Sequence, residues 1–337
     1  MWSIAGLIVN VRIMRAGFAT IVPNPLRDHP QFQAYLALAC VCIFWGTTYL
    51  GIRVALESFS PVALMGIRYT ISGGLMLIVA RAMGVHLPTG KELWQTALFG
   101  VFALGIGTGT LCWAELTIPS GLAALFCTTS PFWMVGIEVL MPEGEPLHAP
   151  TILGMLVGLG GVVFLVARTA FGGTAQTNGM VPAFVLLQIG LGAWALGSIL
   201  QRKQISKAHP FVSGAVQQFA TGLAFLAASL IFHSRMTWTP RGVGAIAYLA
   251  MFGGIVGYSA FVYSMAHLPI AVASLYNYVN PLVAVALGWV FFREPFGVRE
   301  CIAMVLIFIG VAIVKRQSVA VKKLGADRAA ESGQYGE

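Results

Sequence analysis

Long apolar stretches alternate along the chain with short connections that carry proline, glycine and much of the charge. Ten of these stretches are about 20 residues long, the length at which a helix crosses about 30 Å of hydrocarbon. The expected spans are residues 33–56, 61–83, 93–115, 119–141, 150–168, 179–200, 210–233, 242–265, 269–292 and 297–316. Because the connections leave no room for a soluble domain, the pattern predicts an all-α membrane protein with ten transmembrane helices.

Composition strengthens this interpretation. The 337 residues are 58% apolar and 9% charged, and the mean hydropathy is +0.82. So few charged side chains cannot cover the surface of a water-soluble domain of this size, whereas a bilayer requires far fewer. The net charge of +8 does not indicate a nucleic-acid partner, because the basic residues lie in short loops and the C-terminal tail and form no single stripe.

The distribution of Lys and Arg predicts how the chain is oriented. Cytoplasmic loops retain positive charge, and more of the basic residues fall on the side that would hold both ends of the chain. We therefore expect a multi-pass protein of a bacterial inner membrane with both termini in the cytoplasm. Residues 1–32 are expected to form a cytoplasmic leader and residues 317–337 a cytoplasmic tail.

The sequence contains no motif for metal, disulfide or nucleotide chemistry. There is no CxxC pair, no HExxH, no EF-hand loop and no GxxxxGK[ST] sequence. The five cysteines lie in apolar runs and are interpreted as small core residues; they are Cys40, Cys42, Cys112, Cys127 and Cys301. We therefore expect no metal and no cofactor, and any transport would be secondary, without direct use of ATP.

The chain also repeats itself. Sliding the sequence over itself by 149 or 150 positions aligns proline, glycine and tryptophan residues, which hydrophobicity alone does not align. Among the aligned pairs are Trp45 and Trp194, Arg53 and Arg202, Pro61 and Pro210, Gly73 and Gly222, Gly107 and Gly257, Pro131 and Pro281, and Glu145 and Glu294. Residues 33–168 and 179–316 thus form two repeats of five helices each. Because five is odd, the second repeat enters from the opposite face, which predicts an inverted pair around a central cavity.

Several segments are similar to the EamA family of the drug/metabolite transporter superfamily, and within it to the YedA-like inner-membrane exporters. The similarity extends from Phe32 to about Arg316, and the segments that carry it are 44–77, 107–133, 193–199 and 252–295. They include FWGTTYLGIRVALESFSPVALMGIRYT and SLYNYVNPLVAVALGWVFFREP. The resemblance implies ten helices in two inverted units, and a transporter of small molecules.

Two charged residues are the first candidates for a substrate site. Arg68 lies inside the second predicted span and Glu115 at the end of the third, so both are expected at similar depth and facing inward. The two side chains can pair as a structural brace, or they can bind substrate. A carboxylate beside a cation stays ionised, whereas burial favours its protonated form; Glu115 is therefore also a candidate for coupling transport to protons. The resemblance implies that Arg68 is the family's usual arginine in this helix.

The ninth predicted span contains a second polar group. Tyr276, Asn277 and Asn280 precede Pro281, and the two amides lie one turn apart on one helix face. The amides can line the cavity, or they can satisfy backbone carbonyls that Pro281 leaves without a helical donor. The equivalent Pro131 in the fourth span follows Cys127 and Ser130, so both prolines are expected to kink their helices.

Large aromatic residues are candidates for the cavity wall. They are Trp45, Tyr49, Trp113 and Tyr263, although aromatic residues also gather at membrane interfaces. In the second repeat Gln217 and Gln218 occupy the positions of Arg68 and Tyr69. This polar but uncharged counterpart is consistent with an asymmetric substrate.

These observations favour a secondary exporter of small metabolites, either amino acids or amphipathic drugs, that works by alternating access. Coupling of this transport to protons is a further hypothesis, which rests on Glu115. The partners of the exporter would be a small-molecule substrate and membrane lipid. Two other classes remain open. An enzyme acting on lipid-linked substrates would need convergent acids, histidines or a nucleophile with its base, which the sequence does not group. A passive channel or a non-transporting scaffold would share the repeat but would show no saturable counterflow.

Overall fold

The computed structural model describes residues 32–141, 149–172, 179–204, 208–268, 276–294, 297–310 and 312–313. The predicted leader, apart from Phe32, and the predicted tail at 317–337 lie outside these residues. So does the beginning of the ninth predicted span, residues 269–275. Within the described part the regular structure is helical, and one isolated antiparallel bridge joins Phe59 to Met236.

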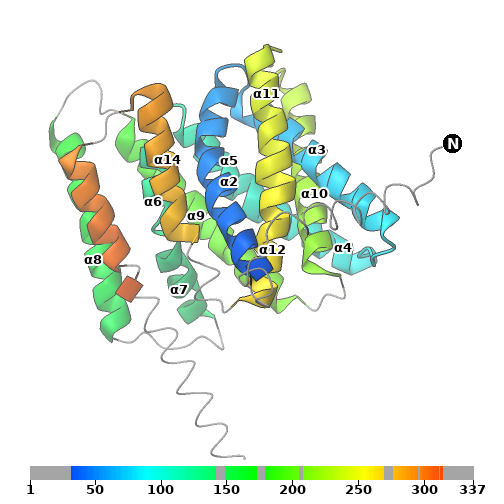
Figure 1. The fold of residues 1–337 in the computed structure, drawn as a ribbon, viewed down its shortest axis with the longest axis horizontal. Helices are drawn as coiled ribbons and strands as arrows, with labels where there is room; N and C mark the ends of the chain where they lie inside the picture. Colours follow the sequence, from blue (N-terminus) through cyan, green and yellow to red (C-terminus); the bar gives the residue numbers. More distant parts are fainter. Residues whose placement is uncertain are drawn as a thin grey trace, which may run out of the picture.

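Helical residues occur in all ten predicted spans (Figure 1). In the first repeat they are α2 (Phe32–Leu56), α3 (Pro61–Ala82), α4 (Gly90–Gly100), η1 (Val101–Ile106), α5 (Gly107–Ala114), α6 (Ser120–Cys127), α7 (Ser130–Leu140) and α8 (Ala149–Gly172). In the second they are α9 (Met180–Lys203), α10 (Pro210–Ile231), α11 (Pro240–Tyr248), η3 (Leu249–Val256), α12 (Gly257–His267) and α14 (Tyr276–Phe292), followed by helical residues 298–310.

Seven described helices are long and apolar enough to cross a membrane. They are Phe32–Leu56, Pro61–Ala82, Gly90–Ala114, Ser120–Leu140, Met180–Gln201, Pro210–Ile231 and Pro240–Ser264. The apolar helices at Ile152–Gly161 and Val279–Phe292 are shorter. The all-helical fold is therefore confirmed, while the number of ten complete spans stays a prediction.

The helix starts follow from local sequence. Ser60 and Thr239 each precede a proline, and their hydroxyl oxygens accept hydrogen bonds from the amides of Ala63 and Gly242 at 3.2 and 3.0 Å. Such side chains satisfy amides that the first helical turn leaves without partners, and proline fits there because it has no amide hydrogen. These caps fix where α3 and α11 begin.

Both repeats contain the same irregularity in their third span. The helix Gly90–Ala114 changes to π-helical geometry at η1, and the helix Pro240–His267 does so at η3. A π-helical turn carries one extra residue per hydrogen-bonded ring and is often found at functional sites. Its recurrence at equivalent places supports the repeat that the sequence alignment predicts.

The second helices of the two repeats, α3 and α10, cross closely and run antiparallel. A Cβ atom at Gly66 would lie 2.6 Å from the backbone nitrogen of Leu226. Further along, Gly73 lies against the backbone of Phe219, and Gly222 against that of Thr70. As the residue number in α3 increases from one contact to the next, the residue number of the partner in α10 decreases. Because α3 and α10 are equivalent in the repeat, their antiparallel packing shows that the two halves are inverted.

In the remaining contacts, the first helix of each repeat packs against equivalent helices of the other repeat. The first helix of repeat one, α2, packs on α12 and α14, and the first helix of repeat two, α9, packs on α5 and α7. Trp45 of α2 lies against Gly257, while Trp194 of α9 lies against Gly107. At one side of the molecule α8 packs against helix 298–310 (Figure 1). Each contact therefore has a counterpart related by an approximate two-fold axis.

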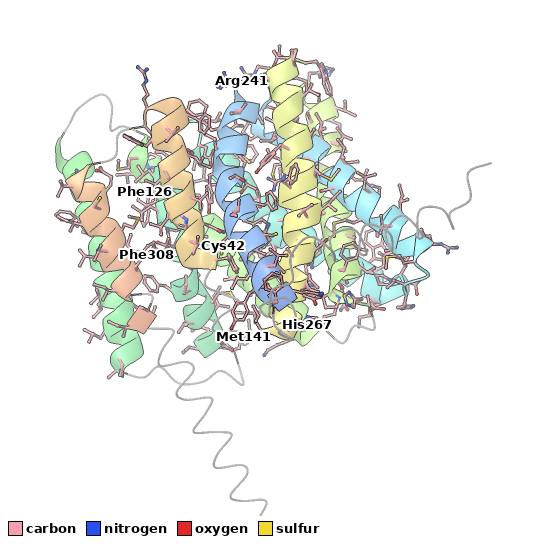
Figure 2. All side chains as sticks on the ribbon, viewed as in Figure 1. Cys42, Phe126, Met141, Arg241, His267 and Phe308 are labelled. Carbon is pink, nitrogen blue, oxygen red and sulfur yellow. The ribbon has the colours of Figure 1, made fainter. Side chains whose placement is uncertain are left out.

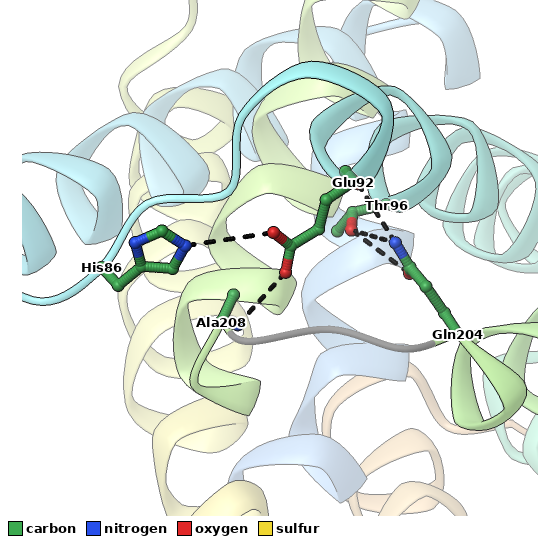
Figure 3. Close-up of polar contacts among 5 residues, drawn as sticks. All are labelled: His86, Glu92, Thr96, Gln204 and Ala208. Atoms are coloured by element: carbon green, nitrogen blue, oxygen red, sulfur yellow. Dashed lines mark hydrogen bonds and ion pairs between the residues drawn. The ribbon is translucent and has the colours of Figure 1, made fainter.

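Connections that are equivalent in the two repeats lie at opposite ends of the bundle. At one end, the Ser60 amide donates to the Arg235 carbonyl at 3.0 Å, and the Thr237 amide to that of Ser58 at 2.8 Å. At the other end, the Ala208 amide donates to the Glu92 carboxylate at 3.2 Å (Figure 3). Figure 2 shows Arg241 at the first end and Met141 with His267 at the second.

Buried apolar side chains form two main clusters in the described part of the bundle. One surrounds Phe59, Leu64 and Leu249, and the other surrounds Phe126 and Leu187. Apolar side chains on the outer face are exposed, as expected where lipid rather than water is the solvent.

The close crossing of α3 and α10 makes a stability prediction. Gly222→Ala places a methyl group against the backbone of Thr70, so the helices must separate, at a cost of about 1–3 kcal/mol or more. We expect a clearly lower melting temperature of the detergent-solubilised protein. Gly244→Ala is the matched control, because Gly244 is also helical but has no atom within 4 Å of an added Cβ. Equal melting temperatures for the two variants would contradict the crossing.

Candidate functional site

Arg68 is held on α3 where this helix faces η3. Its side chain is only 6% exposed, and its Nε and Nη1 atoms have no hydrogen-bond partner. The guanidinium carbon lies 4.9 Å from the centre of the Tyr69 ring. A Cβ atom at Gly253 would be 3.1 Å from Arg68 Nη2, so a glycine in the π-helical segment makes room for the guanidinium.

Glu115 lies immediately after α5 and is 1% exposed. Neither carboxylate oxygen has a hydrogen-bond partner. Its main-chain carbonyl instead accepts a hydrogen bond of 2.6 Å from Nη1 of Arg53. The structure therefore does not form the Arg68–Glu115 pair that the sequence suggested as a brace, because both side chains retain unpartnered polar atoms.

Other charges act on this region electrostatically. Arg53 attracts the Glu115 carboxylate and Glu294 repels it, while both Arg68 and Glu115 act on the buried thiol of Cys112. Cys112 lies on α5, three residues before Glu115. Arg68 and Glu115 thus both lie within electrostatic reach of the Cys112 thiol without pairing with each other directly.

Tyr49 connects the charged region to the fourth span. Its hydroxyl group and the Cys127 thiol are hydrogen-bond partners, and Tyr49 also lies within electrostatic range of Glu115 and Tyr276. Tyr49 and Cys127 are half-buried. This arrangement brings together residues from α2, α5, α6 and α14.

The predicted aromatic wall is partly assembled. The Trp45 ring lies 5.1 Å from the Phe261 ring and 5.2 Å from the Tyr276 ring, between ring centres. Its indole nitrogen donates to the Gly253 carbonyl at 3.1 Å. Trp113, in contrast, is 39% exposed on the outside of α5. Trp45 and Tyr276 therefore form one group, and no described contact joins Trp113 to it.

Asn280 bridges two helices. In the orientation that satisfies its neighbours, its amide nitrogen donates to the Tyr276 carbonyl at 3.1 Å and the Cys42 carbonyl at 3.0 Å. The Asn280 amide therefore binds two backbone carbonyls, but neither is the Asn277 carbonyl, which Pro281 leaves without its helical donor. Asn277 lies on the same helix, but its side chain is outside the described part of the structure.

The two prolines differ in effect. Pro131 stands in the first turn of α7, after an interruption of the helix at Thr128 and Thr129. The hydroxyl groups of these two threonines donate to backbone carbonyls one turn earlier, at 2.6 and 2.8 Å. Pro281 lies within the continuous helix α14. Only the first proline follows a break between two described helices.

The glutamines of the second repeat are engaged in packing. Gln218 accepts a 2.6 Å hydrogen bond from the Ser72 hydroxyl group, which ties α10 to α3. Gln217 packs against Gly100. In the part of the chain that the structure describes, no three His, Cys, Asp or Glu side chains are grouped to hold a metal.

Sequence reasoning missed Arg53, Glu294 and Gln188. It named Arg53 and Glu294 only as members of aligned repeat pairs and did not consider Gln188. Gln188 of α9 accepts hydrogen bonds from the Trp133 indole at 2.8 Å and the Thr129 hydroxyl at 3.1 Å. The available signals were the place of Arg53 in the last turn of its helix and the repeat alignment of Glu294 with Glu145.

Comparison with known proteins adds independent findings. The sequence model of the EamA-like transporter family matches residues 32–167 and 182–316. The uncharacterised inner membrane transporter YedA of Escherichia coli is 33% identical over 85% of this chain and 90% of its own length. The uncharacterised transporter YvbV of Bacillus subtilis is 24% identical, over 88% of this chain and 96% of its own.

Two further similarities are more distant. A probable terminal-alkyne amino-acid exporter of Streptantibioticus cattleyicolor is 22% identical over 86% of this chain and 96% of its own. A solved structure, titled only as the crystal structure of a protein, superposes with a TM-score of 0.61 at 20% identity. It covers 84% of this chain and 97% of its own, which shows similarity of fold alone.

The unpartnered state of Arg68 gives a stability prediction. If Arg68 were a structural brace, its removal would destabilise the protein, whereas removing an unpaired buried charge relieves a desolvation penalty. We expect Arg68→Met to melt at the same temperature as the parent protein or higher, measured in detergent without added ligand. A melting temperature several degrees lower would favour the brace. Ser72→Ala is a matched control on the same helix that should melt lower, because it leaves Gln218 without its donor.

Proposed function

The chain belongs to the EamA-like transporter family, and on that premise we propose that it is a secondary transporter that exports small metabolites by alternating access. Its family and its transporter-named relatives make it a membrane transporter rather than an enzyme. We place it as a multi-pass protein of a bacterial inner membrane, with residues 33–168 and 179–316 as its two repeats. Both termini, including residues 1–32 and 317–337, would lie in the cytoplasm.

One observation carries the proposal: a buried arginine and a buried glutamate retain polar atoms without partners. Leaving an ion unpaired in a protein interior costs several kcal/mol, and buried polar groups are normally satisfied. A substrate with a carboxylate and an ammonium group would satisfy both. The carboxylate would accept hydrogen bonds from Arg68, and the ammonium group would donate to Glu115.

This chemistry favours amino acids over amphipathic drugs as the substrate class. The relative from Streptantibioticus cattleyicolor, a probable terminal-alkyne amino-acid exporter, supports the same choice. Trp45, Tyr49 and Tyr276 would form the wall beside the two charges, and Asn277 would lie one turn from Asn280. Asn280 itself would act mainly in packing, since its amide nitrogen already has two acceptors.

Alternating access follows from the inverted repeats. Equivalent helices exchange partners across an approximate two-fold axis, so two arrangements that differ in which end is open can have similar energies. A passive channel would need no such second state. Saturable exchange of substrate across the membrane therefore distinguishes the two functions.

Transport in proteoliposomes tests the proposal. Vesicles loaded with a mixture of unlabelled L-amino acids should take up externally added labelled amino acids by counterflow, faster than vesicles without protein. Arg68→Met should reduce this exchange by at least about tenfold, the loss of about 1.4 kcal/mol or more of substrate binding. Exchange that never saturates with substrate, or that is unchanged in Arg68→Met, would contradict the proposal.

Proton coupling is tested separately at Glu115. In the parent protein, a pH gradient should drive accumulation of labelled substrate against its concentration gradient. Glu115→Gln cannot exchange a proton, so it should lose the response to the gradient. Its saturable counterflow should persist but need a higher substrate concentration, because the amide binds the substrate ammonium more weakly than the carboxylate. Glu57→Gln is the control, because Glu57 is an exposed carboxylate 3.5 Å from Arg241. An undiminished response to pH in Glu115→Gln would exclude Glu115 as the coupling residue.

A further inference from the structure

Residues 115–121 comprise the turn after α5 and the first two residues of α6, and Arg53 binds the first half of this segment. Nη1 of Arg53 donates to the Glu115 carbonyl at 2.6 Å and to the Ile118 carbonyl at 3.3 Å. The last carbonyls of a helix have no partner within it and carry partial negative charge. A cation placed there stabilises the end of α5 and fixes the path of the chain that follows.

The second half of the same turn is held by Glu294. Its Oε1 accepts hydrogen bonds from the Ser120 amide at 2.8 Å and the Ser120 hydroxyl group at 2.9 Å, and its Oε2 accepts one from the Gly121 amide at 3.0 Å. These amides begin α6, where partial positive charge favours an anion. The carboxylate comes from the other repeat, just beyond the end of α14. It thus ties the two repeats together.

Gly288 on α14 provides the space for this contact. A Cβ atom at this position would collide with the Glu294 carboxylate and would lie 3.2 Å from the Ser120 hydroxyl oxygen. The main-chain amide of Glu294 also donates to the Gly288 carbonyl at 3.1 Å. The Glu294 carboxylate can therefore occupy this position only because residue 288 has no side chain, and this steric requirement does not depend on the charge of Glu294.

The fourth span is packed very differently at its two ends. Six of the eight residues of α6 are buried, including Ser120 and Gly121, which Glu294 binds. None of the residues of α7 is buried. The half of the span next to Arg53 and Glu294 is mostly buried, while the residues beyond the break at Thr128 and Thr129 are at most partly buried.

We propose that Arg53 and Glu294 form a latch that holds this end of the bundle shut and that must open for substrate to pass. This inference rests on the proposed alternating access and adds the residues that hold one of its two gates. The latched turn begins with Glu115, so releasing the turn also moves a carboxylate of the proposed substrate site. Occupancy of the site and opening of the gate are thereby connected through one short segment.

The proposal is tested by the accessibility of Cys127, which needs no substrate. Cys127 lies seven residues beyond Ser120 on α6, about 10 Å along the helix axis. A parent variant keeps Cys127 and has its other four cysteines replaced. Reconstituted vesicles of known orientation are treated on one side with a charged, membrane-impermeant thiol reagent, and the labelling rate is compared between the two orientations.

Glu294→Ala should raise the rate at which Cys127 is labelled from the side that carries residues 115–121, by about tenfold or more. Labelling from the opposite side should fall or stay unchanged. Gly288→Ala should have the same effect although it keeps the charge of Glu294, because its methyl group displaces the carboxylate. Glu57→Ala, which removes an exposed carboxylate at the same end, and Gly136→Ala, at a glycine with open space around it, are controls that should label like the parent.

Unchanged labelling in both Glu294→Ala and Gly288→Ala would overturn the latch, and so would an equal rise from both sides, which indicates general loosening. If these variants do not fold, Glu294→Gln decides, since it retains one acceptor oxygen; failure of all three to fold would make the contact purely structural and refute a gating role. Loss of counterflow with side-specific labelling intact would count against the proposed substrate site and not against the latch.

Discussion

An ionisable side chain buried in a membrane protein with polar atoms that lack hydrogen-bond partners is among the least favourable arrangements in a fold, and Arg68 and Glu115 are two such side chains in the described part of this structure. Arg68 on α3 faces η3, and Glu115 follows α5 next to Arg53 of α2, and the two side chains do not pair directly. The rest of the molecule provides the rigid surroundings that keep them apart. Such an arrangement is stable only if packing elsewhere supports it, and it is useful only if something else completes the pairing.

That support comes from the close contact of the repeats. The crossing of α3 and α10 through Gly73 and Gly222 brings the helix that carries Arg68 against its equivalent in the other repeat. The π-helical segment η3 leaves a glycine opposite the guanidinium, and the turn held by Arg53 and Glu294 fixes Glu115. Small residues at crossings, and a cation and an anion at helix ends, thus determine where the two unpartnered charges lie.

Much of the fold could be predicted from the sequence because lipid restricts the choice to helices of known length. The repeat could also be read, since Trp45, Trp194, Gly107 and Gly257 align in sequence and exchange contacts in the structure. The direct Arg68–Glu115 pair could not be tested by pattern alone. Equal depth brings two side chains to one level, but whether they meet depends on helix rotation, which apolar periodicity leaves undetermined in helices that are apolar all round.

The roles of Arg53 and Glu294 were hidden for a related reason. Both bind main-chain groups in a segment that joins two other helices. Main-chain groups are nearly the same for every residue type, so the sequence of that segment does not indicate which side chain will bind it. Asn280 was only half predicted: its sequence position allowed either cavity or backbone contacts, and the acceptors at Tyr276 and Cys42 became visible only in three dimensions.

The central claim remains that substrate completes the pairing of Arg68 and Glu115. Its most direct measurement is ligand-induced thermal stabilisation by an amino acid, by its amine analogue without the carboxylate and by its acid analogue without the amino group. The account predicts that the amino acid stabilises the parent protein most, that Arg68→Met no longer distinguishes it from the amine, and that Glu115→Gln no longer distinguishes it from the acid; equal discrimination in the parent and both variants would contradict it.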